Sequence, residues 1–282
     1  MLDIFNNNAF SAVSMTQSIN ILPHQPRRIE QMGLFDFEGI STTTAVVGNN
    51  NGQLSLLPTK ARGDSPTQMS HSKKNVRAFP VPHIPAADVI SPGDVQNLLA
   101  LPGSQQMAVA ATLINQRMTT MRSSMEATIE HLKIGAVKGN ILDSDGTSVL
   151  FNLFTEFGIS ETAVDFVLGT ATTNIKNKCL EVARGIETVL GSETYDHIHC
   201  LCSSTFFDKL TSHAKVTAAY ERWQNGDFLR ADNRRGFTFA SITFEEYRGK
   251  VGSVDFIPAG DARFFPVGVM GLFKHFAAPG NS

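Results

Sequence analysis

The sequence predicts an α+β protein, and three observations lead to this fold class. Residues 104–138 contain no proline and have the apolar periodicity of one long helix. Residues 39–90 are rich in β-branched side chains and are interrupted by turn residues, as expected for an extended hairpin. After residue 158 short strands mix with helices, which is typical of an α+β domain.

The composition is that of an ordinary globular protein and excludes several other classes. The net charge of −2 argues against a protein whose whole surface binds nucleic acid. Three cysteines do not form a disulfide framework, which indicates a reducing compartment. The N-terminus lacks the pattern of a signal peptide, and no stretch reaches the ~18 apolar residues of a membrane helix. We therefore expect a soluble intracellular product that has one elaborated domain, or two domains sharing a core.

The first segment, residues 1–38, predicts an irregular arm. Short apolar stretches alternate with Pro23, Pro26 and two glycines, and no period is long enough for a helix that could bury itself. Such an arm lies either along its own domain or along a neighbouring one. Arg27 and Arg28 are then either solvated charges or partners in a salt-bridged interface.

Residues 39–91 predict an extended β-hairpin. The stretch GISTTTAVVG forms the first strand, Asn51-Gly52 supplies a turn, and QLSLLP returns as a second strand. The later stretch NVRAFPVPHIP resumes an extended path because each proline restricts the residue before it. A long two-stranded ribbon is marginally stable alone, so we expect it to pack on something else.

The helix of residues 104–138 begins at the N-cap residue Ser104 and ends at Gly139-Asn140. Its apolar stripe comprises Met107, Ala111, Ile114, Met118, Met121, Met125, Ile129, Leu132 and Ala136. Its polar face carries Thr112, Gln116, Thr119, Ser123, Glu126, Glu130 and Lys133, and Arg122 pairs with Glu126. At 1.5 Å per residue it is roughly 50 Å long and acts as a strut. A coiled-coil arm is the alternative, although the stripe lacks sustained charged flanks.

The remaining elements follow from periodicity and caps. A hairpin is expected over 140–157, a short helix from Ser160 to Leu168, and a second helix over 174–190. The apolar face of that second helix comprises Ile175, Cys179, Val182, Ile186 and Val189. The stretch YDHIHCLCS predicts a strand, residues 204–223 a helical region, and GFTFASITFEEYR a pair of strands.

Candidate chemical sites all have a simpler explanation. Two histidines and two cysteines within residues 197–202 suggest zinc, but a strand places the two types on opposite faces, which favours a buried strand. Residues 143–146 begin like a calcium loop and lack its later ligands, so we expect a turn. Glu245-Glu246 would be solvated or salt-bridged rather than a catalytic pair. Because no standard catalytic motif occurs, we expect no catalytic residue, no metal and no cofactor.

Separated blocks of the sequence match recurring stretches of one protein family. The blocks are GISTTTAVV, GQLSLLPTKARGDSP and KKNVRAFPVPHIPAADVIS in the first half, and RGFTFASITFEEYRG and FIPAGDARFFPVG in the second. Together they extend over most of residues 35–268, and they resemble the lambda-like bacteriophage major capsid protein family (capsid protein E).

The resemblance implies the tailed-phage (Hong Kong 97-type) capsid fold. Its parts would be an N-terminal arm (1–38), an extended β-hairpin loop (39–91), a peripheral domain (92–158) with the spine helix 104–138, an axial domain (159–255) and a return to the peripheral domain (256–282). Chains of this family normally continue past the position of residue 282. The sequence is therefore expected to be either a part of a longer chain or a member that closes its domain differently.

The resemblance also implies a function. The chain would be the major capsid protein of a tailed double-stranded DNA bacteriophage, assembled in the host cytoplasm through hexamers and pentamers into the icosahedral head of the virion. Its partners would be itself, a portal, a decoration or cement protein and the enclosed DNA, bound without sequence-specific contacts, with no membrane. An encapsulin-like nanocompartment shell is one alternative, and an α+β enzyme with an unrecognised site is another.

Charged residues are the candidates for contacts between subunits. The densest basic cluster comprises Lys60, Arg62, Lys73, Lys74 and Arg77, and Arg27 and Arg28 lie in the arm. The cluster lacks the interleaved aromatic residues that nucleic-acid stacking requires, and a solvated hairpin edge is the simpler alternative. In the capsid interpretation the cluster contacts acidic groups of the next subunit. The candidate acidic partners are Glu245, Glu246, Asp255 and Asp261.

Overall fold

The computed structural model describes residues 27–49, 75–89, 103–191, 193–223, 234–251 and 253–280. The chain divides into two compact units, one of residues 1–33 and 82–133 and the other of residues 34–81 and 134–282. Helices and strands are mixed in an α+β arrangement. In the described part of the chain, no helix is both long enough and apolar enough to cross a membrane.

The long helix α4 (Gly103–Lys138) confirms the element that the periodicity predicted. It begins one residue before Ser104, and it ends where Gly139 adopts a φ of +80°, which favours glycine. Its last residue, Lys138, donates a hydrogen bond from Nζ to the carbonyl oxygen of Phe256 at 3.0 Å. Burial, and then the nearby charge of Arg263, lower the pKa of Lys138.

The buried face of α4 differs in part from the predicted stripe. Ile114 is buried as expected, but Met125 is exposed and Glu130, predicted on the polar face, is buried. The reason is a short helix, α2 (Arg28–Gln31), whose residue Ile29 is fully buried and donates its N–H to Glu130 Oε1 at 3.0 Å. The prediction of an irregular arm over residues 1–38 is therefore wrong for this segment. The predicted Arg122–Glu126 pair is confirmed at 3.1 Å.

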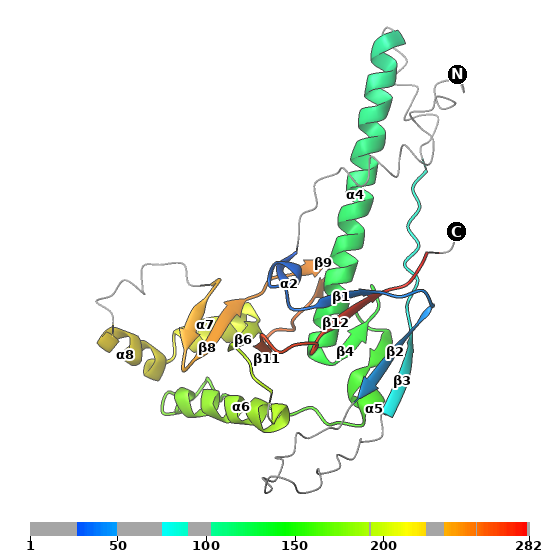
Figure 1. Cartoon of the computed structure of the whole chain (residues 1–282). Helices are drawn as coiled ribbons and strands as arrows, with labels where there is room; N and C mark the ends of the chain where they lie inside the picture. The colour runs from blue at the N-terminus through cyan, green and yellow to red at the C-terminus, as the bar shows by residue number, and fades with distance from the viewer. Residues whose placement is uncertain are drawn as a thin grey trace, which may run out of the picture. The chain divides into compact units, whose positions relative to one another are not determined.

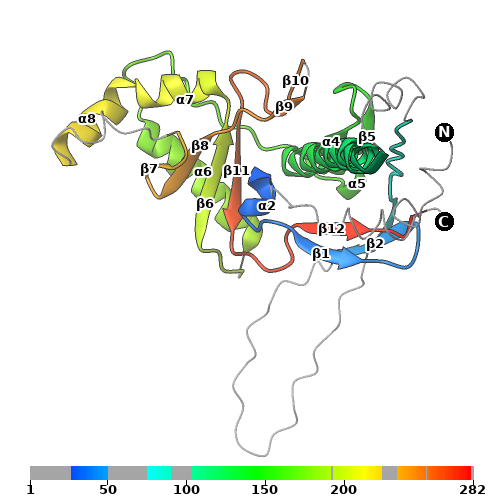
Figure 2. The same cartoon turned by 90° about the horizontal axis from the view of Figure 1, so that it is seen from above.

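A four-stranded sheet organises the second unit. In sheet order its strands are β11 (Ala262–Val267), β6 (His197–Cys202), β8 (Ile242–Glu246) and β7 (Phe237–Phe239). Strand β6 pairs antiparallel with β11 and parallel with β8. The helices that accompany the sheet are α6 (Ile175–Leu190), α7 (Ser204–Thr211) and α8 (Ala214–Trp223) (Figures 1 and 2).

The core of this sheet domain lies between one face of the sheet and the helices. It contains Ile175, Cys179, Ile198, Cys200, Cys202, Phe206, Phe207, Leu210, Val216, Phe237, Ile242 and Phe244. Burial raises the pKa of the Cys179 thiol to about 12 and also raises that of Cys200. Cys179 and Cys200 therefore remain neutral thiols, and all three buried cysteines behave as small apolar side chains, as the buried-strand interpretation predicts.

The helix predictions on either side of residue 170 had different outcomes. Helix α6 is confirmed, with the Asn174 side chain accepting from the N–H of Asn177, although Val189 is exposed rather than part of the apolar face. The short helix predicted from Ser160 to Leu168 is wrong. The Asp165 carboxylate accepts from the N–H of Val167, which has a φ of +47°, so turns replace the helix.

Two-stranded ribbons complete the second unit. One ribbon is parallel and pairs β1 (Asp36–Gly39) with β12 (Lys274–Ala277). The other three are antiparallel: β2 (Thr44–Asn49) pairs with β3 (Asn75–Pro80), β4 (Asn140–Leu142) with β5 (Val149–Asn152), and β9 (Lys250–Val251) with β10 (Val254–Asp255). Strand β1 is a second departure from the predicted irregular arm, because pairing with β12 orders residues that have no periodicity of their own. The strand predicted in QLSLLP lies outside the described residues.

The 140–157 hairpin is confirmed only for its two strands. Residues 153–157 form helix α5 (Leu153–Phe157) instead of continuing the second strand. The Asn152 side chain caps this helix by accepting from the N–H of Thr155, and Gly158 ends it in the left-handed conformation. The turn predicted at residues 143–146 is confirmed by a hydrogen bond from the N–H of Gly146 to the carbonyl oxygen of Asp143.

Candidate functional site

The ribbon of β2 and β3 packs through one of its faces. Residues that are directly opposite in an antiparallel pair share a face, so Ala45 and Phe79 lie on one side with Arg77. The Phe79 ring centroid lies 5.8 Å from those of Phe151 and Phe157, and Ala45 is buried. This inner face is therefore held by β5 and α5 of the same chain.

The opposite face of the ribbon is apolar and exposed. It carries Thr44, Val46, Gly48, Val76, Ala78 and Pro80. Val46 and Val76 are 62% and 60% exposed, and they lie on neighbouring strands of the same face. Single exposed apolar residues are ordinary, but adjacent ones on a narrow ribbon mark a surface suited to a protein partner. We call the six residues the outer face of the ribbon.

The edges of the ribbon are also available for pairing. Within the described residues, β2 and β3 form a sheet of two strands and neither pairs with a third. Unpaired edges present backbone donors and acceptors to any strand that approaches. The ribbon thus offers both an apolar face and hydrogen-bonding edges, a combination suited to protein–protein contact and not to chemistry on a small molecule.

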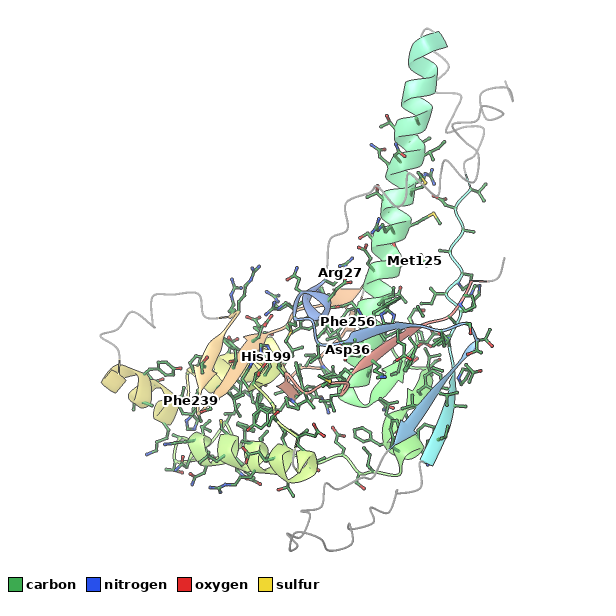
Figure 3. All side chains as sticks on the ribbon, viewed as in Figure 1. Arg27, Asp36, Met125, His199, Phe239 and Phe256 are labelled. Carbon is green, nitrogen blue, oxygen red and sulfur yellow. The ribbon has the colours of Figure 1, made fainter. Side chains whose placement is uncertain are left out.

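A buried polar pair of the described residues lies in the sheet domain. His199 Nε2 and Glu245 Oε2 are 3.2 Å apart, and the two residues are 5% and 3% exposed. Phe265, on the neighbouring strand β11, lies against the imidazole with ring centroids 5.7 Å apart (His199 is marked in Figure 3). The described residues contain no group of three histidine, cysteine, aspartate or glutamate side chains that could hold a metal. The pair is therefore interpreted as a structural hydrogen bond that links the side chains of β6 and β8.

Comparison with known proteins identifies the family. The profile of the family described as phage major capsid protein E matches residues 11–282. The chain belongs to this family. It is similar to the major capsid protein of Pseudomonas phage KPP10, with 28% identity over 296 residues that cover 97% of this chain and 84% of the relative. It is also similar to the major capsid protein of Salmonella phage Felix O1 (isolate Felix O1-VT1), with 25% identity over 308 residues that cover 100% of this chain and 82% of the relative.

The basic candidates have different positions in this capsid protein E family member. Lys60, Arg62, Lys73 and Lys74 lie outside the described residues. Arg77 lies on the inner face of the ribbon, 3.7 Å from the Glu156 carboxylate, and about half of each side chain is exposed. Arg77 therefore contacts its own chain, and its exposed part remains accessible to a second one.

The arginines of the first unit are also engaged within the chain. Arg27 donates from Nη2 to the carbonyl oxygen and the hydroxyl of Ser123 on α4, at 3.0 and 3.2 Å. Arg28 is half-buried in the first turn of α2. The structure thus gives Arg27 a role in holding α2 to the long helix.

The acidic candidates Glu245 and Glu246 both have charged or titratable partners within the chain. Glu245 is buried against His199, and the Glu246 side chain is only 7% exposed, with its carboxylate 3.7 Å from Arg248. Strand β8 is an interior strand whose two edges pair with β6 and β7, and on one face of the sheet the Glu245 carboxylate lies 3.2 Å from His199 Nε2. Asp261 pairs with Arg263 at 3.0 Å, whereas Asp255 is exposed on β10. Within the chain Glu245 is therefore engaged by His199, and Asp255 is the more accessible of the acidic candidates.

Sequence reasoning missed the outer face of the ribbon. The signal was present as alternation in TAVVGN and NVRAFP, where every second residue is small or β-branched. The alternation does not show which face of a strand is covered, because both faces carry apolar residues. The partner of β2 could not be assigned either, because β3 is separated from it by residues 50–74.

Proposed function

We propose that this phage coat protein assembles with copies of itself, through hexamers and pentamers, into the closed icosahedral shell of a tailed-phage head, and that the outer face of the ribbon contacts a neighbouring subunit. The observation that carries the proposal is the difference in packing between the two faces of the ribbon. Its inner face is packed against β5 and α5, whereas Val46 and Val76 are more than half exposed on its outer face.

Burial of the outer face would favour assembly by the hydrophobic effect. Complete burial of a valine side chain contributes about 1.5 kcal/mol or more. One such contact is weak against the entropy lost when two proteins associate, but a closed shell repeats the contact at every subunit. The unpaired edges of β2 and β3 add backbone hydrogen bonds if the neighbour presents an extended segment.

The finer architecture belongs to the same proposal. The ribbon with residues 50–74 would form the extended loop of the Hong Kong 97-type fold, α4 the spine helix, and the sheet domain with α6, α7 and α8 the axial domain. The shell would be part of the virion, assembled in the host cytoplasm, and would contact a portal and a decoration or cement protein. Enclosed double-stranded DNA would need no sequence-specific contact, in keeping with the net charge of −2.

A double substitution on the outer face tests the proposal. In Val46→Asp/Val76→Asp, subunits should remain folded because both positions are exposed, but particles should be lost because two carboxylates cannot be buried against a neighbour. Sedimentation and electron microscopy measure particle yield, and circular dichroism measures folding. Val149→Asp, at a valine that is 55% exposed on β5, is the matched control and should assemble. Normal particle yield from the double variant would contradict the proposed contact.

The basic cluster supplies a second, electrostatic part of the proposed contact. A single exposed ion pair contributes under about 1 kcal/mol, so one charge reversal should have little effect. Lys73→Glu with Lys74→Glu should slow or abolish assembly, and wild-type assembly should weaken at high salt, where the Debye length is about 3 Å. Full yield of the double reversal at low salt would leave the outer face as the only proposed contact.

The content of the particles separates the phage head from a nanocompartment shell. A phage head holds double-stranded DNA and has a portal vertex, whereas an encapsulin-like shell encloses cargo protein. Nuclease-protected DNA of phage length together with a unique vertex in images would support the head. Protein-filled particles without a portal would support the nanocompartment.

A further inference from the structure

Helix α6 carries its end charges in the order that its own dipole disfavours. A helix dipole favours acidic groups in the first turn and basic groups in the last turn, by about 0.3–1 kcal/mol each. In α6 the first turn has no acidic residue and contains Lys176 and Lys178, whereas the last turn has no basic residue and contains Glu187. Lys178 is compensated by Glu181 at 3.0 Å, which leaves Lys176 and Glu187 as the charges at the two ends. Within one chain the helix dipole therefore does not stabilise Lys176 at the first turn or Glu187 at the last turn.

The basic end of α6 borders a pocket of about 550 Å³. Its walls come from the start of α6, from α8 and from the β7 end of the sheet (Phe239 is marked in Figure 3). Lys176 and Lys215 supply two exposed cations, and Tyr220 and Phe239 supply aromatic surface with ring centroids 6.3 Å apart. The pocket is therefore apolar inside and positively charged at its rim. We call it the basic pocket.

The other end of α6 carries the complementary groups. Val189 is 86% exposed, among the most exposed apolar residues described, and in the sequence it stands between the exposed residues Glu187 and Glu193. The Tyr195 hydroxyl donates to Glu187 Oε1 at 2.7 Å and orients that carboxylate. We call the three residues Glu187, Val189 and Glu193 the acidic knob.

One chain cannot place its own knob in its own pocket. Asn174 in the pocket wall and Val189 in the knob lie at opposite ends of one continuous helix. At 1.5 Å per residue they are separated by about 22 Å along the helix axis. Any occupant with the chemistry of the knob must therefore come from another molecule.

We propose that the acidic knob of one copy binds in the basic pocket of the next copy, so that the α6 helices follow one another head to tail around a ring. The inference rests on the proposed self-assembly and names one of its contacts. Val189 would pack on Tyr220 and Phe239, and the two glutamates would pair with Lys176 and Lys215. A contact between two different patches of one chain is heterologous, and it generates closed rings when its rotation closes.

A designed disulfide tests this contact directly. Val189→Cys with Ala219→Cys places one thiol in the knob and one in the exposed pocket wall, and a disulfide requires Cα atoms within about 7 Å. The two positions are too far apart for a bond within one chain, and the three native cysteines are buried. After oxidation of assembled particles, a denaturing gel without reductant should show a ladder of covalent multimers that disappears on reduction. Val149→Cys with Ala219→Cys is the matched control and should remain monomeric.

Charge reversal with rescue is the second test. Lys176→Glu/Lys215→Glu and Glu187→Lys/Glu193→Lys should each lower particle yield at least tenfold while circular dichroism stays native. Co-expression of the two variants should restore six-membered rings, in which the variants can alternate so that each knob meets a pocket of opposite charge, whereas a five-membered ring keeps one mismatched contact. The quadruple variant should restore complete particles, because every copy then carries a basic knob and an acidic pocket. Loss of yield through local misfolding would not be rescued in this way.

The outcomes separate this inference from the proposed function. Particles of the cysteine variant without a ladder, or charge reversals that assemble normally or are not rescued, would overturn the knob-and-pocket contact and leave self-assembly intact. Wild-type chains that form no particles under any condition would instead overturn the proposed function.

Discussion

The sheet domain and the β2–β3 ribbon contain strands of similar composition that have opposite fates. Strands β6 and β2 are both six residues long and rich in apolar side chains. β6 pairs with a strand on each side, and five of its six residues are buried, whereas among the described residues β2 pairs with β3 alone and exposes Val46. Ile198, Cys200 and Cys202 of β6 lie in one core cluster with side chains of α6, α7 and α8. The elements packed on the faces of an apolar strand thus decide whether it stabilises the subunit or remains available to another molecule.

The largest expected effect comes from removing an aromatic ring on the buried side of this comparison. Phe244 is fully buried in the sheet core, so Phe244→Ala should lower the free energy of unfolding by about 3–5 kcal/mol. Val76→Ala on the ribbon should change it by no more than about 0.5 kcal/mol. Urea denaturation of unassembled subunits measures both. A loss above about 1 kcal/mol for Val76→Ala would mean that the outer face is covered within the subunit.

An intermediate effect is expected for the polar pairs of the same two regions. Glu245→Ala removes the carboxylate from buried His199 and should cost about 1–3 kcal/mol, since a buried polar group loses a partner. Glu156→Ala removes the half-exposed partner of Arg77 and should cost under about 1 kcal/mol. Thermal unfolding of both variants provides the comparison. Equal losses would show that burial does not distinguish the two pairs.

The smallest effect is expected in the exposed turn between β4 and β5. The Asp145 carboxylate accepts from the N–H of Thr147 and from the N–H and hydroxyl of Ser148, and these hydrogen bonds hold its pKa well below its usual range. A carboxylate whose pKa is lowered in the folded state stabilises the fold at pH values above its unfolded pKa of about 3.9. This contribution is lost as the pH falls toward the pKa of the folded state. Asp145→Ala should therefore lower the free energy of unfolding at pH 7.

The dependence of that loss on pH distinguishes the carboxylate from the turn itself. The difference in unfolding free energy between Asp145→Ala and wild type should shrink between pH 7 and pH 3. Asp145→Asn is the control, because its amide oxygen still accepts a hydrogen bond without titrating. A loss that stayed constant over this pH range would assign the effect to backbone conformation rather than to ionisation.

Local signals in the sequence were sufficient for most of the individual elements. Helix α4 follows from an apolar period without proline and from the stop at Gly139, and α6 follows from its period and the cap at Asn174. Strand β6 and the β7–β8 pair follow from alternation. Residues 153–157 show the limit, because the same alternation was compatible with a strand until the Asn152 cap and Gly158 selected a helix.

By itself the sequence determined where helices and strands form, because periodicity, caps and turn residues act over a few neighbouring residues. Only the tertiary structure decided which faces are covered, because burial depends on segments far away in the chain. Residue 39 pairs with residue 277, the buried Glu130 carboxylate accepts from the N–H of Ile29, and the buried Glu245 carboxylate meets His199 of β6. The exposure of Val46, Val76 and Val189 follows from the same cause, since no described segment of the chain covers them.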